Sequence, residues 1–175
     1  VVPIGSYGVS TKKALEIKNR KNKPNDIVIF TSYVPLFNHP KLRYFIREIA
    51  TAFPERTIWL QLKSYFHEND TAKKFINDCM EGLDNIVYTS GMLDDLIDKV
   101  GYAFSDPSTI ILETVQFGVP SFVIDVVEKQ EYCIYREVPH FCQSDARRSI
   151  ELIDSIENGK WSYPFETFKD LVEIP

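Results

Sequence analysis

A hydroxyl pair and a carboxylate stand close together in an otherwise apolar segment, SDPSTIILETVQFGVP. Ser108 and Thr109 lie near its start, and Glu113 follows Thr109 by four residues. We predict a largely buried helix that begins near Pro107, with Asp106 as its N-cap. The hydroxyls then lie in the first turn, where unpaired amides and the helix dipole attract an anion. Glu113 lies one turn further along, on the same face as Thr109.

This arrangement of residues suits a nucleoside phosphate. A buried carboxylate without a partner is strongly destabilising, so Glu113 needs one. A ribose diol supplies two donors for the two carboxylate oxygens, next to a phosphate held by Ser108 and Thr109. An alternative stays open, in which the hydroxyls only cap the helix and Glu113 forms an ion pair with a lysine at the sheet edge.

Short β-branched runs alternate with helical patterns along most of the chain. The pattern predicts strands over 26–32, 57–63, 85–90, 102–105 and 120–126, and helices over 41–53, 71–81, 92–100, 107–117 and 145–158. Asp70 is expected to cap one of these helices, and Gly101 and Gly118 to end two others. Such alternation favours right-handed crossovers, and hence an α/β fold: a Rossmann-like, doubly wound parallel sheet of five or six strands flanked by helices. We expect a single domain over 1–175, with 159–175 as a C-terminal tail.

Polar side chains follow the predicted strands at the carboxyl edge of the sheet, where doubly wound folds bind ligands. The residues expected at this edge are Thr31 and Ser32, Lys63 to His67, Thr89 to Met92, Asp106 to Thr109, and Asp125 to Glu128. Hydroxyl groups and a lysine are suited to binding a phosphate. A lysine at the end of a strand can equally well be solvated, so this alternative for Lys63 stays open.

Composition argues against several other classes of function. The 175 residues carry a formal net charge of −5, which disfavours nucleic acid as a partner. No apolar run approaches the roughly 20 residues of a membrane span, and no signal peptide opens the sequence. The three cysteines are widely spaced and form no CxxC motif, which disfavours a disulfide framework or a zinc site and favours a reducing, cytoplasmic location.

No residue pattern points to a metal or a cofactor. His39, His67 and His140 have no Cys or His companion at metal-ligand spacing, so we expect structural or surface roles for them. Neither GxGxxG nor GxxxxGK[ST] occurs, which weighs against a dinucleotide or P-loop site. Arg136, Arg147 and Arg148 are expected to be solvated, with the alternative that Arg136 contacts a partner domain.

The run from Ser108 to Pro120 resembles the C-terminal nucleotide-sugar-binding domain of the GT-B glycosyltransferases. That superfamily also includes the UDP-N-acetylglucosamine 2-epimerases and the teichoic-acid glycerophosphotransferases. The resemblance rests on Ser108-Thr109, on Glu113 and on the Gly-Val-Pro that precedes a hydrophobic strand, while residues 2–6 are similar to the linker that enters this domain. Two departures are the absence of the Glu-x7-Glu pattern of retaining enzymes and the Asp-Pro pair where many relatives have glycines.

The resemblance implies a nucleotide-sugar site without a cofactor. It assigns Ser108 and Thr109 to the diphosphate and Glu113 to the ribose. It also implies that Thr31 and Ser32 face phosphate and that the base lies against Thr89, Ser90 and Met92. It further implies a UDP-sugar donor, an N-terminal acceptor domain that this chain lacks, and a role in surface polysaccharide biosynthesis. The chain alone would then bind a donor without turning it over.

Two other functions stay open at this point. The chain could be a non-catalytic Rossmann-like protein-interaction module, in which the aromatic tail over 161–168 is the working surface. It could also be half of an enzyme like the UDP-N-acetylglucosamine 2-epimerases, which would share the same nucleotide site.

Overall fold

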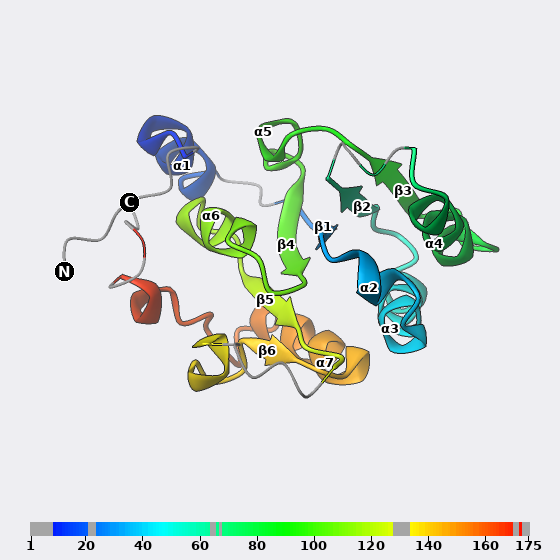
Figure 1. Cartoon of the computed structure of the whole chain (residues 1–175). Coiled ribbons are helices and arrows are strands. Elements are labelled where there is room, and N and C mark those ends of the chain that lie inside the picture. The colour runs from blue at the N-terminus through cyan, green and yellow to red at the C-terminus, as the bar shows by residue number, and fades with distance from the viewer. Residues whose placement is uncertain are drawn as a thin grey trace.

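Six parallel strands form one sheet in the computed structural model, which describes residues 9–20, 24–63, 66, 68–127, 134–169 and 172 (Figure 1). The strands are β1 (Asp26–Thr31), β2 (Ile58–Leu62), β3 (Ile86–Thr89), β4 (Val100–Ser105), β5 (Ser121–Ile124) and β6 (Cys142–Gln143). They lie in the order β3-β2-β1-β4-β5-β6, and each pairing is parallel. The predicted doubly wound α/β fold is confirmed, and β6 is the strand that the sequence pattern did not locate.

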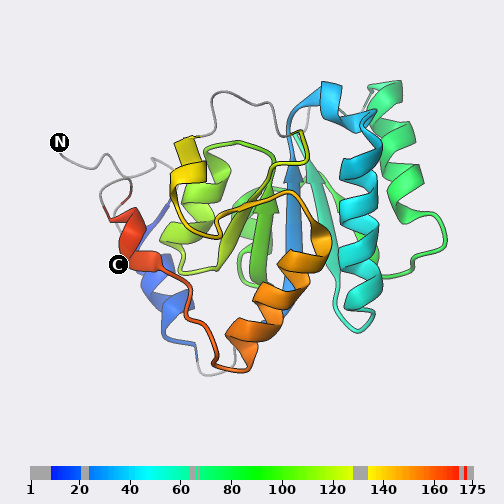
Figure 2. The same ribbon diagram turned by 90° about the horizontal axis from the view of Figure 1, so that it is seen from below.

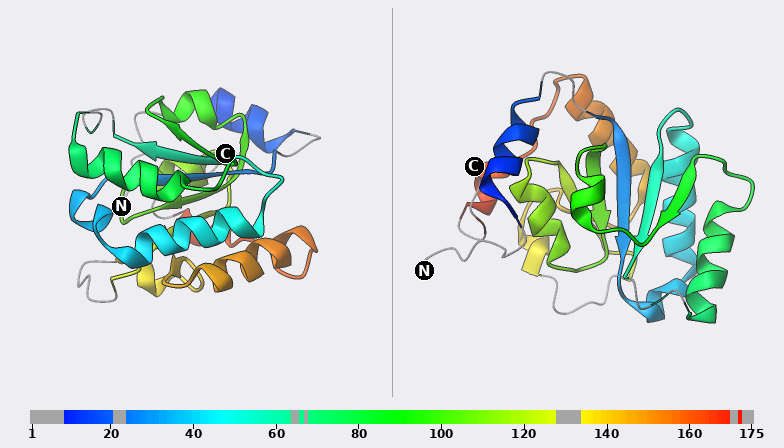
Figure 3. Two further views of the ribbon diagram at one scale, coloured as in Figure 1. Left: turned by 90° about the vertical axis from the view of Figure 1, so that its right-hand side faces the viewer. Right: turned by 90° about the horizontal axis from the view of Figure 1, so that it is seen from above.

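Helices cover both faces of this sheet, as the views in Figures 2 and 3 show. They are α1 (Thr11–Lys18), α2 (Val34–Phe37), α3 (Pro40–Ala52), α4 (Asp70–Met80), α5 (Leu93–Leu96), α6 (Ile110–Gln116) and α7 (Ala146–Glu157), with 3-10 turns η2 (Ile134–Glu137) and η3 (Phe165–Phe168). Helices α3 and α7 pack together on one face, with α4 beside α3, whereas α1, α5 and α6 lie on the other.

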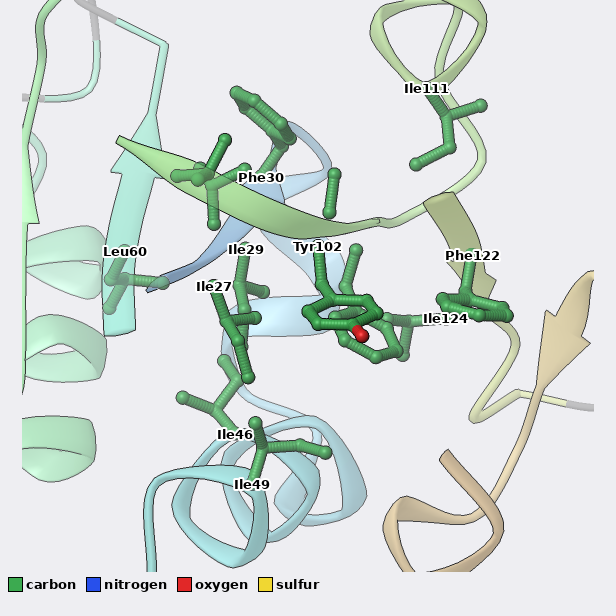
Figure 4. Close-up of a cluster of buried hydrophobic side chains, with 14 of the residues drawn as sticks. Ile27, Ile29, Phe30, Ile46, Ile49, Leu60, Tyr102, Ile111, Phe122 and Ile124 are labelled. Carbon is green, nitrogen blue, oxygen red and sulfur yellow. The ribbon is translucent and has the colours of Figure 1, made fainter. Parts of the chain in front are cut away.

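The central strand β1 is fixed by apolar contacts on both of its faces (Figure 4). Ile27 and Ile29 lie toward Ile46 and Ile49 of α3, and all four side chains are fully buried. The two α3 residues are three positions apart, which puts them on one face of the helix. Successive strand residues alternate between faces, so Phe30 packs on the opposite side of the sheet. This packing holds the carboxyl end of β1 in a defined place.

The helix that follows the hydroxyl pair is shorter than predicted. α6 begins at Ile110 rather than near Pro107, and Thr109 is its N-cap without a side-chain capping bond. Asp106 is therefore not the N-cap, because its carboxylate is bonded elsewhere, as described below. The C-terminal end follows the prediction: Gly118 has a φ of 75°, and its N–H donates to the Val115 carbonyl (2.9 Å), as in a Schellman motif.

Two other predicted boundaries are wrong for physical reasons that the structure shows. The N-cap of α4 is Asn69 and not Asp70, since the Asn69 side chain accepts the Ala72 N–H (3.0 Å). Gly101 lies inside β4 instead of ending a helix, and a Cβ there would clash with the Pro24 carbonyl oxygen. Glycine is therefore needed at this position because another backbone segment approaches closely, and not because the chain turns there. The sequence pattern also predicts no helix where α1 lies.

The aromatic tail packs into the core instead of forming an exposed patch. Phe168 in η3 is fully buried and Tyr163 is 8% exposed. The Tyr163 hydroxyl donates to the Ser121 carbonyl of β5 (2.6 Å), and its ring meets Phe122 edge-on, with centroids 5.6 Å apart. These contacts tie the tail to the β5 side of the sheet.

Candidate functional site

The strand order reverses between β1 and β4, which lie side by side at the centre of the sheet. The chain after β1 runs to α2 and α3 on one face, and the chain after β4 runs to α6 on the other (Figure 3). The two connections diverge at the carboxyl ends of these strands. In doubly wound folds this switch point is where the ligand crevice lies. Ser32 and the hydroxyl pair Ser108-Thr109 are both carried by these two connections.

A buried carboxylate joins the two connections. Asp106, 1% exposed, directly follows β4. Its Oδ2 accepts the backbone N–H groups of Ser32 (2.7 Å) and Tyr33 (2.8 Å), and its Oδ1 accepts the Ser32 hydroxyl (2.9 Å). The Ser105 hydroxyl adds a longer contact to the same Oδ1 (3.5 Å). The loop after β1 is therefore held to the loop after β4 by one side chain.

The environment of Asp106 shifts the pKa of its carboxyl group. Burial raises the pKa of the Asp106 carboxyl above its ordinary value, while the bonds from Ser32 and Tyr33 and the positive charge of Lys63 oppose that rise. The sequence places Asp106 at this edge of the sheet, immediately after a buried strand, but the role predicted for it there, a helix cap, is wrong. Its bonds to the loop after β1 were not predicted.

Lys63 and Thr31 occupy the ends of the two strands beside this carboxylate. Lys63 follows β2, is exposed, and is close enough to Asp106 for its charge to act on the carboxyl group. No described residue forms an ion pair with Lys63, so its ammonium group is available to a ligand. Thr31 ends β1 and is 1% exposed, and its Oγ1 has no hydrogen-bond partner within the described part of the chain.

The hydroxyl pair and the glutamate lie at the start of α6. Ser108 is half-buried and Thr109 exposed, and their carbonyls accept the N–H groups of Ile111 (3.3 Å) and Leu112 (2.9 Å). Glu113 is half-buried. Among the residues that the structure describes, none forms an ion pair or a hydrogen bond with its carboxylate. The alternative in which Glu113 pairs with a lysine is not found there, so its carboxylate remains available to a ligand.

The three residues expected to contact a base lie further out. Thr89 ends β3, two strands from β1, which is about 10 Å away at ordinary strand spacing. The Thr89 hydroxyl accepts the Gly91 N–H (3.1 Å), Ser90 is exposed, and Met92 is 73% exposed. The structure thus brings Ser32, Lys63, Ser108 and Thr109 to the centre of the carboxyl edge and leaves the Thr89–Met92 loop at its outer end.

On the other flank of the crevice, an ion pair follows β5. Arg136 donates from Nε and Nη2 to Asp125 Oδ2, both at 2.7 Å, and Asp125 is 6% exposed. Arg136 is exposed, as expected, and it is also paired. The other carboxylate oxygen, Asp125 Oδ1, is buried without a partner in the described part of the chain.

The structure also describes two histidines and a cysteine away from these residues. His39 precedes α3 at the N-cap position, and the Nδ1 of His140 contacts an Nη of Arg148 (3.1 Å). His67, like residues 2–6, lies outside the described residues. Burial raises the pKa of Cys79 to about 12, so this thiol stays protonated at neutral pH. Over the described ranges, no three His, Cys, Asp or Glu side chains gather as metal ligands.

A hollow of about 440 Å³ lies at the C-terminal end of α4, lined by Asn77, Asp78, Met80 and Glu81. The helix runs opposite to the strands, so this hollow is at the edge of the sheet away from the switch point. The nearby carbonyls of the helix end are capped by the Arg47 guanidinium, which reaches the Glu81 carbonyl at 2.7 Å. This is a helix C-cap, and it offers no reacting group.

The likeness to known proteins lies in the structure and not in the sequence. No protein-family model and no curated protein matches the sequence. Thirty solved chains match its structure. Those described below are longer chains, and this chain matches one part of each. Within the described ranges, no helix is long and apolar enough to cross a membrane.

Three of these solved structures illustrate the likeness. UDP-GlcNAc 2-epimerase from Neisseria meningitidis, bound to UDP-GlcNAc, matches with 17% identity and a TM-score of 0.55 over 94% of this chain and 42% of its own. The wall teichoic acid polymerase TagF has 14% identity and a TM-score of 0.58 over 91% of this chain and 42% of its own. S. aureus MnaA, solved with UDP, has 8% identity and a TM-score of 0.57 over 95% of this chain and 44% of its own. This chain thus spans about two fifths of the length of each, and the likeness at these identities is one of fold.

Proposed function

We propose that this chain is the donor-binding part of a nucleotide-sugar-dependent glycosyltransferase of the GT-B kind. The observation that carries the proposal is the half-buried Glu113, whose carboxylate has no partner among the described residues, one turn after the hydroxyls at the switch point. A ribose diol is the partner that this carboxylate lacks, and Ser108 and Thr109 with Lys63 suit the diphosphate. The likeness to structures solved with UDP and UDP-GlcNAc supports a uridine nucleotide.

In this function the site would act mainly by electrostatics. Transfer of a sugar leaves a nucleoside diphosphate that carries new negative charge. The Lys63 ammonium group, the two hydroxyls and the first-turn amides of α6 would stabilise that charge without a metal. The acceptor and the catalytic base would come from another part of the enzyme, a proposal that the two-fifths coverage of the similar structures supports. The likeness to a wall teichoic acid polymerase supports a role in surface polymer synthesis, and we place the protein in the cytoplasm.

Calorimetry with UDP, GDP, CDP and ADP tests this proposal. We expect saturable binding of one nucleotide, with UDP preferred, and at least a tenfold loss of affinity in Glu113→Ala, because the mutation removes both acceptors for the ribose hydroxyls. The matched control is Glu151→Ala, which removes the carboxylate of an exposed glutamate on α7. That glutamate pairs with Arg147. Equal affinity of wild type and Glu113→Ala, or no binding of any nucleotide at millimolar concentration, would contradict the proposal.

A second candidate is the corresponding part of a UDP-GlcNAc 2-epimerase, which the likeness to the Neisseria meningitidis structure favours. The nucleotide site would be the same, and the difference would lie in the other part of the enzyme. The interaction-module hypothesis loses its support, since the tail it relied on is buried in the core through Tyr163 and Phe168.

A further inference from the structure

The donors at the end of β1 are already used inside the protein. The N–H groups of Ser32 and Tyr33 and the hydroxyl of Ser32 all point to the Asp106 carboxylate, at 2.7 to 2.9 Å. In Rossmann-like folds the turn after the first strand is where backbone amides approach a ligand phosphate. Here that place is taken by a carboxylate, which is an anion of similar hydrogen-bonding character.

This arrangement changes what Ser32 can offer to a ligand. A hydroxyl group has one proton to donate and two lone pairs to accept with. Since the Ser32 proton is directed to Asp106 Oδ1, only the lone pairs of its oxygen remain for a ligand at this half-buried position. Above its raised pKa, the Asp106 carboxylate behind it adds negative charge. A phosphate, which needs donors and positive charge, is disfavoured at this position, whereas a ligand hydroxyl that donates a proton is favoured.

We propose that Asp106 takes the place of a ligand phosphate at the end of β1, and that Ser32 Oγ there accepts a hydrogen bond from a ligand hydroxyl. The ligand's diphosphate would then lie toward Lys63 and the start of α6. The identity of the ligand in this proposal rests on the proposed function, and the ligand hydroxyl belongs either to the sugar or to the ribose. The internal role of Asp106 does not depend on the proposed function.

The internal role is tested without any ligand, by following backbone amide resonances in NMR as the pH is changed. We expect the Ser32 and Tyr33 amides to shift together with one midpoint above the ordinary pKa of an aspartate, and this shift to be absent in Asp106→Asn. Among the described residues, Lys63 is the charged group that acts on Asp106, and its positive charge lowers the pKa of Asp106. We therefore expect Lys63→Ala to move the midpoint to higher pH. Asp84→Asn, which changes an exposed aspartate, is the control.

Amides that do not titrate in the wild type, or that titrate alike in Asp106→Asn, would overturn the internal role. If Asp106→Asn proves unfolded by its spectrum, the wild-type and Lys63→Ala titrations decide the question alone. An absence of movement of the midpoint in Lys63→Ala would count against the arrangement of charges described above.

The ligand-facing role is tested by calorimetry of Ser32→Ala with inorganic diphosphate, UDP and UDP-GlcNAc. We expect diphosphate affinity to stay within about twofold and affinity for the UDP-sugar to fall about fivefold, the effect of one lost hydrogen bond. A fall for UDP as well would assign the hydroxyl to the ribose, and a fall for UDP-GlcNAc alone would assign it to the sugar. Lys63→Ala should weaken all three ligands.

A loss of diphosphate affinity in Ser32→Ala as large as that in Lys63→Ala would overturn the inference, because Ser32 would then donate to phosphate. Unchanged affinity for every ligand would overturn the hydroxyl contact. If the wild type binds none of the three, the proposed function and the ligand-facing role fail together, and the amide titration still decides whether Asp106 fills the end of β1.

Discussion

At the scale of single residues, Asp106 connects the stability of the fold to the chemistry of the crevice. Its carboxylate is buried, and burial raises its pKa because a charge is disfavoured away from water. The folded state therefore holds the Asp106 proton more tightly than the unfolded state does. By linkage, the contribution of this group to stability is fully present below its unfolded pKa and is lost as the pH rises through its folded pKa.

A comparison of wild type with Asp106→Asn isolates this effect. We expect the difference in free energy of unfolding, wild type minus variant, to decrease as the pH rises from the ordinary value of 3.8 through the raised pKa of Asp106, and then to level off. Other carboxyl groups titrate in both proteins and cancel in the difference. Urea unfolding at a series of pH values provides the measurement. A difference that is constant with pH, or that rises, would show that Asp106 does not have a raised pKa.

Residues that face a site are easier to predict from sequence than the bonds between them. Ser108, Thr109 and Glu113 are close in the chain, and their placement at the start of one helix follows from local spacing. The bond between Asp106 and Ser32 joins residues 74 positions apart, and only the pairing of β1 with β4 brings them together. The sequence also places Lys63 at a strand end, but its effect on Asp106 depends on the same tertiary arrangement.

At the scale of elements, helix ends differ in how well local sequence determines them. The end of α6 is set by Gly118, since a residue without a Cβ adopts the positive φ of a Schellman motif at little cost. Its start is not set locally, because Asp106, a good N-cap by type, is drawn to the loop after β1 instead. Gly101 shows the same limit. Glycine is required there because the Pro24 backbone, which is distant in sequence, approaches closely.

Substitution of Gly118 measures how firmly the end of α6 is fixed. We expect Gly118→Ala to lower the free energy of unfolding by about 1–2 kcal/mol, because an alanine at a φ of 75° brings its Cβ against the backbone. Gly118→Asn should lose less, since asparagine tolerates the left-handed region better. The midpoints of urea denaturation give both values. Equal stability of all three proteins would mean that the helix end shifts to another geometry without cost.

At the scale of the whole molecule, the tail after α7 completes the core on the β5 side. Phe168 packs against Phe141 with ring centroids 4.8 Å apart and stacks with Tyr163 at 5.9 Å, and Tyr163 in turn meets Phe122 of β5. These rings link β5, the segment before β6 and the tail into one apolar layer. The tail therefore supports the strand that flanks the switch point, and a loss of its packing should loosen that side of the crevice.

Phe168→Ala tests whether the tail is core or surface. We expect a loss of about 3–5 kcal/mol in the free energy of unfolding, since a fully buried ring would leave a cavity. Tyr163→Phe should cost about 1 kcal/mol through its bond to the Ser121 carbonyl. Glu166→Ala, on the exposed side of the same turn, should change stability by less than about 0.5 kcal/mol. Urea unfolding separates the three values. Were Phe168→Ala as stable as Glu166→Ala, the tail would be a surface element after all, and the protein-interaction hypothesis would regain the support that the packing of Phe168 now removes.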